Sequence, residues 1–376
     1  MGFIFTLIVT LGVFLFPPQL WSKDIKPIEG GGELKFGYDS NVYQNFSQAE
    51  DAFINLGLDL AGSFYPGRGN RLQLAYILDA HWYFQEESER MHQHELLFKF
   101  IQRLGARAKL EAGVRGMAHL QPEAPEFGYR KLLPYFVGRF DLPFLFTTKI
   151  EYEFKEVIYP DYDLDHQGHF FRLEISREAG LTGEIWLRGG ADWAVYEERY
   201  VLNASAEPTP EHQKNLLLQA GVGGRVDLGS RVNLALGLDY KHNASNANYY
   251  YEGPYGKHNP QVNPELVSNY YRFNEALVNS TLKLWPRPRT ELTVGASGGI
   301  RAYQDRQARD KADRLKGEKE TDLLVKAEGS WRQDLARRKT GIPYWLFRLN
   351  LALSSSNDYY SDWWALSAST GAGVDF

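Results

Sequence analysis

The sequence predicts an all-β fold, a single antiparallel up-and-down β-barrel that crosses a membrane with about sixteen strands. Three observations predict it. The first is an alternation of apolar and polar residues that repeats along most of the chain, and the second is a regular succession of short and long connections. The third is the contrast between 14% aromatic residues and a negative mean hydropathy. Alternation explains this contrast, because each apolar residue on one face of a strand is averaged with a polar residue on the other.

Composition and charge exclude several classes of protein. The 376 residues include no cysteine, which excludes a disulfide scaffold and a cysteine-ligated zinc or iron–sulfur site. After residue 20 no run of about 18 apolar residues occurs, which excludes a helical membrane protein. The net charge of −5 provides no basic face for nucleic acid. A soluble β-sandwich or propeller stays open as an alternative, although its strands are usually about 5 or 6 residues long.

The N-terminus predicts a cleaved secretory signal. Residues 3–16 form one apolar block, which is followed by two prolines and the charged Lys23. This length fits the apolar region of a signal peptide better than a spanning helix. An exported chain without cysteine needs no oxidative folding, which favours a bacterial envelope protein. The expected divisions are a signal peptide over 1–22, a periplasmic N-terminal tether over 23–31 and the barrel over 32–376.

Sixteen segments carry the alternation expected of strands. In residues 146–155, Phe146 and Ile150 lie on one face, while Lys149 and Glu151 lie on the other. Such a segment has about the length that a tilted strand needs to cross a membrane. The even number is expected of a closed single-chain barrel with both termini on one side. The predicted strands are 33–43, 52–65, 71–84, 93–103, 107–120, 129–142, 145–158, 168–178, 183–197, 214–227, 231–242, 270–285, 289–304, 321–333, 344–356 and 363–376.

The connections between these segments alternate between short and long. The short ones lie near 66–70, 104–106, 142–143, 180–182, 228–230 and 286–288, with a longer one at 334–343. The long ones include 85–92, 121–128, 159–167, 198–213, 243–269 and 305–320. Short periplasmic turns and longer external loops are the asymmetry of an outer-membrane barrel.

Aromatic residues lie where the alternation begins and ends, as in two girdles at the boundaries of a bilayer. Near the long loops they include Trp82, Trp193, Tyr196 and Trp364, and near the short turns they include Phe64, Trp285 and Trp345.

Over its mature length the chain resembles bacterial outer-membrane β-barrel proteins of the porin-like kind. The resemblance rests on the alternating strands, on the opening segment 37–43 (Gly-Tyr-Asp-Ser-Asn-Val-Tyr) and on the ending 371–376 (Gly-Ala-Gly-Val-Asp-Phe). It implies an outer-membrane location with both termini periplasmic, and contacts with outer-membrane lipid and lipopolysaccharide. It also implies that Val374 and Phe376 form the signal that the barrel assembly machinery recognises.

The polar face of the strands is expected to line the lumen. A barrel of sixteen strands is wide enough for a water-filled interior. Both signs of charge are interspersed, so we expect weak charge selectivity or extensive internal pairing. As an alternative, many of these residues are structural cross-strand pairs that keep the wall polar. The predicted lumen-lining residues are Asp59, Asp79, Lys99, Glu111, Arg115, Arg139, Glu151, Glu153, Arg172, Glu174, Arg188, Asp192, Arg225, Asp239, Arg301, Lys326, Glu328, Arg332 and Arg348.

Two long loops can narrow the channel or cap it. The segment 243–269 is rich in Asn, Tyr and Pro, and it stacks on planar ligands such as sugar rings if it folds inward. Its candidate constriction residues are Tyr249, Tyr250, Tyr251, Tyr255 and His258. The alternative is an outward loop that caps the barrel. The segment 305–320 mixes basic and acidic residues, which favours a solvated surface loop that can be helical; as an alternative, its cations contact lipid phosphates.

Other chemical motifs are weaker. Asp161, Asp163 and Asp165 resemble the start of a calcium loop, but position six is His166 instead of Gly, which favours a simple acidic loop. A His pair at 92 and 94 points to one side of a strand, yet no third metal ligand is near in sequence. No catalytic grouping can be assembled, so we expect no enzyme activity and no cofactor.

The sequence therefore predicts an outer-membrane channel or facilitator that passes small polar solutes through a lumen of mixed charge. The alternative is a barrel that sheathes or docks a protein or polymer partner without being an open pore. Nucleic acid is not an expected partner.

Overall fold

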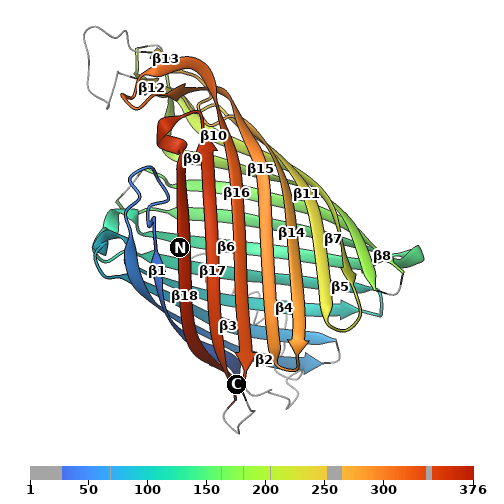
Figure 1. Ribbon diagram of the computed structural model, residues 1–376. Helices are drawn as coiled ribbons and strands as arrows, with labels where there is room; N and C mark the ends of the chain where they lie inside the picture. The colour runs from blue at the N-terminus through green and yellow to red at the C-terminus, as the bar shows by residue number, and fades with distance from the viewer. Residues whose placement is uncertain are drawn as a thin grey trace.

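The computed structural model describes residues 28–67, 69–161, 163–180, 182–203, 205–251, 265–335 and 341–376. Sixteen of its strands form one closed antiparallel barrel, in which each strand pairs with its neighbours in the chain and β1 pairs with β18 (Figure 1). The expected all-β class and the expected sixteen strands are confirmed. None of the helices in these ranges has the length and apolar character needed to span a bilayer.

The barrel strands have the following bounds: β1 (Glu29–Asp39), β2 (Asp51–Gly67), β3 (Asn70–Tyr83), β4 (Met91–Leu104), β5 (Ala108–Leu120), β6 (Tyr129–Asp141), β7 (Phe146–Ile158), β8 (His166–Ala179), β9 (Gly183–Leu202), β10 (Pro208–Asp227), β11 (Val232–Ser245), β14 (Phe273–Arg287), β15 (Thr290–Arg309), β16 (Leu315–Asp334), β17 (Ile342–Ser356) and β18 (Trp363–Asp375). A separate hairpin of β12 (Tyr249–Tyr251) and β13 (Glu265–Val267) stands between β11 and β14. Short 3₁₀ turns occupy Glu87–Glu89, Pro125–Phe127, Pro143–Leu145 and Tyr359–Ser361.

The two ends of the barrel differ in their connections. At one end the turns are tight, and Gly105 and Gly180 adopt the left-handed φ values of 71° and 68° that such turns require. The C-terminus lies at this short-turn end (Figure 1). At the other end lie the long loops and the β12–β13 hairpin, which rises beyond the barrel wall. The predicted asymmetry of the connections is therefore present in the fold.

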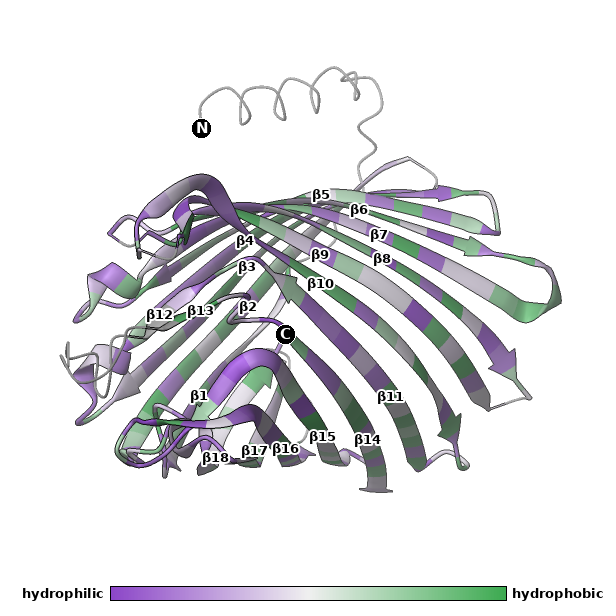
Figure 2. Cartoon of the chain, turned by 90° about the horizontal axis from the view of Figure 1, so that it is seen from above, coloured by the Kyte–Doolittle hydropathy of each residue, from purple (hydrophilic) through white to green (hydrophobic). Residues whose placement is uncertain are grey.

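Strand alternation separates the residues into two faces. On β17, Trp345, Leu349 and Leu353 belong to a row of apolar side chains that are 36% to 53% exposed, whereas Tyr344 and Leu346 on the opposite face are buried. Cross-strand pairs keep one face throughout the barrel, so the exposed apolar row continues from strand to strand as a band. Figure 2 shows the ring from above, with hydrophobic and hydrophilic residues alternating along the strands. The band marks the outer face.

Three expected loops are shorter than the sequence indicated. Residues 198–213 and 305–320 are mostly strand, because β9, β10, β15 and β16 each run for 20 residues. The connections that remain are 203–207 and 310–314. The expectation of a solvated, helical loop at 305–320 is wrong for most of the segment, which forms the ends of β15 and β16. Opposite charges such as Arg306 and Glu320 pair across these two strands. A mixture of charges is also typical of a solvated loop, so composition alone does not distinguish the two structures. Residues 243–269 likewise contain the end of β11 and the hairpin β12–β13.

Smaller differences concern the first strand and the girdles. β1 begins at Glu29, so the last three residues of the expected tether belong to the barrel. Tyr196 pairs with His166 on the inner face and is not part of a lipid-facing girdle. Trp285 also differs, because its Nε1 donates to Glu291 3.3 Å away on the inner face. Alternation decides the face of a residue, and a position near a strand end does not.

Candidate functional site

The inner face of the barrel carries the charged residues. The register of the strands puts every predicted lumen-lining residue on the face opposite the apolar band. Several lie directly opposite a charge of the other sign: Lys149 faces Glu174, and Glu151 faces Arg172. The inner wall is therefore a lattice of mixed charge. The part that these residues take in transport stays a prediction.

Glu275 is one of the most enclosed charges of this wall. Its side chain is only 3% exposed. Its Oε1 accepts from the Nζ of Lys241 at 2.7 Å, and its Oε2 accepts from the Nε and Nη2 of Arg301 at 2.9 and 2.6 Å. One carboxylate therefore joins β11, β14 and β15. The three residues are direct cross-strand neighbours in the register.

A second ion pair passes over an intervening strand. Arg188 on β9 donates from Nη2 to both carboxylate oxygens of Asp239 on β11, at 2.6 and 2.8 Å. Gly221 on β10 lies opposite both residues. A side chain there would collide with Asp239 and approach the Nε of Arg188 to 2.9 Å. The missing side chain of Gly221 is what lets the guanidinium reach across.

Several inner-face charges were not among the predicted residues. They include Glu33, Lys35, Glu95, Lys155, Lys241 and Glu275, and each forms an ion pair with another inner-face residue. Arg115, for example, lies 3.2 Å from the Oε1 of Glu95. The same alternation that identified the others would have found them.

One inner cavity of about 360 Å³ lies along β4 to β7. Five cations and three carboxylates are among its lining residues, together with Tyr135, whose hydroxyl donates to Glu111 at 3.1 Å. The charged lining residues are Lys99, Lys109, Arg115, Arg139, Lys149, Glu111, Glu151 and Glu153. This part of the wall carries a small excess of positive charge.

Within the described ranges, some of the charged side chains that point inward are exposed to solvent, whereas others, such as Glu275, are buried. The side chains of Arg139 and Arg225 are 59% and 61% exposed, although both lie on the inner face of a closed ring of strands. A packed interior would bury them, as it does in small barrels filled by side chains. Both residues lie two positions from the end of their strands, β6 and β10, so the barrel is open to solvent at its short-turn mouth.

Aromatic and histidine rings gather on the inner face near the long-loop end. His119 stacks on Tyr129 with ring centroids 4.7 Å apart, and His166 lies 5.0 Å from Tyr196. Further around the barrel, the ring of Phe53 contacts that of His81, and the ring centroids of Phe273 and Tyr303 are 5.9 Å apart. We call these eight residues the aromatic rim. Sequence reasoning missed it, because the rings alternate with charged residues on many different strands and form no local motif.

Above the apolar band, the hairpin of β15 and β16 holds a buried ionic cluster. Glu320 is fully buried and lies 2.5 Å from the Nε of Arg306, although the two atoms do not meet with hydrogen-bond geometry. Ser361 donates to its other oxygen at 2.8 Å. Arg309 donates from Nε to Asp358 at 3.0 Å. The cluster ties the hairpin to the β17–β18 loop.

The candidate constriction residues are only partly described. Tyr249, Tyr250 and Tyr251 form β12, and the ring of Tyr249 lies 4.8 Å from that of Tyr270. Tyr255 and His258 lie outside the described residues. The hairpin extends beyond the barrel wall in Figure 1, and its role as a constriction stays a prediction.

The weaker motifs have local partners. The Oδ1 of Asp165 accepts the backbone N–H of Tyr159 at 2.6 Å, and the backbone carbonyl of Asp163 accepts from Arg199. No group of three His, Cys, Asp or Glu residues placed to hold a metal occurs in the described ranges, so the loop that also contains Asp161 shows no such grouping. His92 and His94 lie on the outer face, where the Nδ1 of His94 is 2.9 Å from the hydroxyl of Tyr76.

The C-terminal residues complete the closure of the barrel. The N–H of Phe376 donates to the carbonyl of Gly30 at 2.8 Å, and the carbonyl of Phe376 accepts from Gly30 at 2.9 Å. Val374 lies opposite Gly32 on β1 and Pro343 on β17. A role for Val374 and Phe376 as an assembly signal stays a prediction.

Comparison with known proteins matches the fold and not the sequence. No protein-family model matches the chain, and no curated protein matches it. OccAB1 of Acinetobacter baumannii superimposes with a TM-score of 0.52 at 9% identity, over 93% of this chain and 97% of OccAB1. The fold is that of a porin-like outer-membrane β-barrel.

Other solved structures match over similar lengths. OccAB4 of Acinetobacter baumannii has a TM-score of 0.47 at 12% identity, over 96% of this chain and 100% of OccAB4. A loop-deletion mutant of OmpT, an outer membrane protein of Vibrio cholerae, has a TM-score of 0.46 at 10% identity, over 93% of this chain and 99% of that chain.

Proposed function

We propose that the protein is an outer-membrane channel that passes small polar solutes through its mixed-charge lumen. The observation that carries the proposal is the exposure of inward-pointing charges such as Arg139 and Arg225 in a closed ring of strands. Solvent reaches these side chains, so a hydrated solute can reach them too. The extensive ion pairing keeps the wall polar without giving it one sign of charge.

The proposed orientation follows from the two ends. The short turns and both termini face the periplasm, and the long loops face outward. Residues 1–22 are removed as a signal peptide. Phe376, held against Gly30 at the closing seam, belongs to the segment that the assembly machinery recognises.

The aromatic rim favours solutes that contain a ring. Half-buried rings of Tyr129, Tyr196 and Tyr303 lie along the inner face at the external end, and Lys131 lies 4.4 Å above the ring of Tyr129. Rings of this kind stack on the apolar faces of sugars or of planar molecules, and nearby polar groups orient them. Small sugars are therefore suitable test solutes.

Uptake into vesicles tests this function. The mature chain, refolded into lipid vesicles, should admit neutral sugars at rates that fall as the solute grows, while vesicles without protein should not. The competing role is a barrel that sheathes a protein or polymer. Folded protein that leaves sugar uptake at the level of empty vesicles, and that co-purifies from its native membrane with a stoichiometric partner, would establish the sheath instead.

A further inference from the structure

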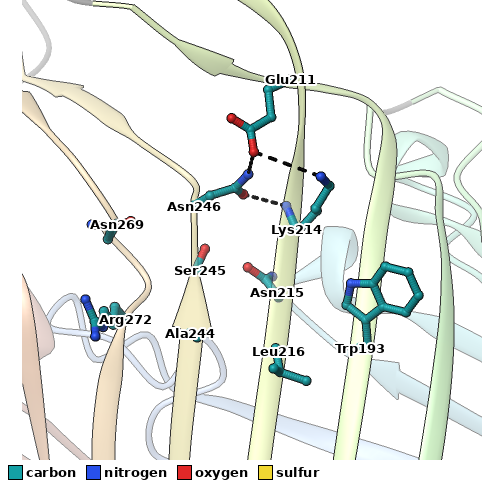
Figure 3. A pocket seen from close by; sticks show the side chains of 10 residues that line it. All are labelled: Trp193, Glu211, Lys214, Asn215, Leu216, Ala244, Ser245, Asn246, Asn269 and Arg272. Atoms are coloured by element: carbon teal, nitrogen blue, oxygen red, sulfur yellow. Dashed lines mark hydrogen bonds and ion pairs between the residues drawn. The ribbon is translucent and has the colours of Figure 1, made fainter.

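A cavity of about 640 Å³ opens on the outer face of the barrel near the long-loop end. Trp193, Leu216 and Ala244 lie in one row across β9, β10 and β11, since Leu216 is opposite both of the others. Arg272 continues this row, because the next residue, Phe273, pairs with Asn243. Ala244 is the smallest side chain of the row, so a hollow forms between Leu216 and Arg272 (Figure 3).

The row belongs to the face that meets the bilayer. On β10 and β11, Leu218 and Tyr240 have the same orientation as Leu216 and Ala244, and both are exposed. Trp193 is exposed as well, and its ring stacks on His169 with centroids 5.7 Å apart. Tryptophan favours the boundary between acyl chains and headgroups. The cavity therefore lies where the apolar band ends.

Polar groups form the rim of the cavity on the side of the long loops. The Nδ2 of Asn246 donates to Glu211 at 2.9 Å, and the Oδ1 of Asn246 accepts the backbone N–H of Lys214 at 2.6 Å. The Nζ of Lys214 is 4.0 Å from Glu211, and both side chains are about half exposed. These groups gather at the top of Figure 3. An exposed pair at this distance is weak, so the ammonium group is available to another anion.

The guanidinium of Arg272 has a buried donor that lacks a hydrogen-bond acceptor among the described residues. In the described part of the chain its guanidinium forms no ion pair, and its Nε is buried without a hydrogen-bond partner. A buried donor without an acceptor is costly, and guanidinium groups bind phosphate oxygens with two parallel hydrogen bonds. Two cations, Lys214 and Arg272, surround the same hollow together with the carboxylate of Glu211 and an apolar floor, and the buried donor belongs to Arg272.

We propose that this cavity binds the phosphate of a phosphorylated lipid in the external leaflet. Arg272 and Lys214 contact the phosphate, Asn246 and Asn269 lie beside the headgroup, and an acyl chain runs over Leu216, Ala244 and Trp193. The occupant is a lipid and not free phosphate, because the floor of the cavity is apolar and continuous with the band. The inference rests on the proposed orientation, in which the long loops face outward.

Lipid binding to the full chain tests the proposal. Native mass spectrometry or fluorescence titration of the folded protein in detergent should show lipid A binding that weakens about tenfold or more in Arg272→Gln. Arg272→Lys should retain part of the affinity. The control is Arg314→Gln, which removes an exposed cation of the β15–β16 turn, far from the cavity in sequence and paired with Asp310; its affinity should stay within about twofold of the wild type.

The chemistry of the ligand is tested with matched probes. Dephosphorylated lipid A should bind the wild type as weakly as lipid A binds Arg272→Gln, and millimolar inorganic phosphate should not compete. Wild-type affinity in Arg272→Gln, or equal binding of dephosphorylated lipid A, overturns the proposal. Sugar uptake by the same Arg272→Gln preparation should be unchanged, so a loss of lipid binding and a failure of the channel are separate outcomes.

Discussion

Glu275 shows what a single charged residue does in this barrel. It is almost fully buried, yet it touches two cations that are only about one-third exposed. Alternation predicts that a residue at this position points inward. It does not predict which partners it meets, since Lys241 and Arg301 belong to other strands. The face of each lumen residue was therefore readable from the sequence, and the ion pairs were not.

Glu275→Gln should destabilise the barrel. The substitution keeps the size of the side chain but leaves Lys241 and Arg301 without their carboxylate. We expect a loss of roughly 1–3 kcal/mol in the free energy of unfolding, measured by urea titration in lipid vesicles. Asp59→Asn is the control, because Asp59 is an exposed inner-face carboxylate without an ion pair among the described residues. A loss no larger than that of the control would contradict the role assigned to Glu275.

Glu320 should make stability depend on pH. It lies beyond the apolar band, and burial raises its pKa from 4.5 to about 7, with Asp358 and Asp322 adding to the rise and Arg306 opposing it. The folded carboxyl therefore holds its proton in a range where the unfolded chain has lost it. Its contribution to stability is full below pH 4.5 and is lost as the pH rises to about 7.

The variant Glu320→Gln isolates this contribution. The difference in unfolding free energy between wild type and variant should change between pH 4.5 and 7. The unfolding free energy of the wild type should fall relative to that of the variant as the pH rises. Above this range the difference should be constant. Parallel curves over the whole range would show that the buried carboxyl does not titrate there.

At the scale of the element, the strands within the apolar band were predictable, and the extensions of the β9–β10 and β15–β16 hairpins beyond it were not. The segment expected at 145–158 is β7, Phe146–Ile158, because most of its outward residues are apolar or aromatic and most of its inward ones are polar. Residues 305–320 lack that contrast, since they lie beyond the bilayer and both faces carry charge. Their strand character depends on cross-strand partners such as Gln307 opposite Lys319, which the sequence does not reveal.

The closing seam should be sensitive to added bulk. Gly371 on β18 lies against β1, and a Cβ there would collide with the carbonyl oxygen of Leu34 and approach the Cγ of Lys35 to 2.8 Å. Gly371→Ala should therefore weaken β1–β18 pairing by roughly 1–3 kcal/mol. The measurement is the temperature at which the compact band is lost on an unheated SDS gel.

Gly329→Ala is the matched control for the seam. A Cβ at Gly329, on the outer face of β16, meets nothing within 4 Å. This variant should unfold at the temperature of the wild type. Equal behaviour of the two variants would mean that the contact between Gly371 and Leu34 does not limit closure.

For the whole molecule, the mixed lining should give weak ion selectivity. Pairs such as Arg188–Asp239 and Lys155–Asp192 cancel much of the field that either partner would create alone. The permeability ratio of K⁺ to Cl⁻, obtained from the reversal potential in a salt gradient, should lie within about threefold of unity. A strongly one-sided ratio would require a ring of like charge that the described wall does not show.

The whole-molecule architecture was the most predictable level, and the site was less so. The sixteen alternating segments and the two kinds of connection can be read directly from the linear sequence, so they are predictable without knowledge of the three-dimensional structure. The aromatic rim and the outer cavity depend on which residues of distant strands share a level. Register and tilt determine that, and they follow from pairing all sixteen strands at once.

Conductance across a planar lipid bilayer tests the central claim, that the closed ring of strands encloses an open path. The folded mature protein should insert in discrete steps of equal conductance that scale with the salt concentration. Verified insertion of folded protein with no step in current would contradict an open lumen.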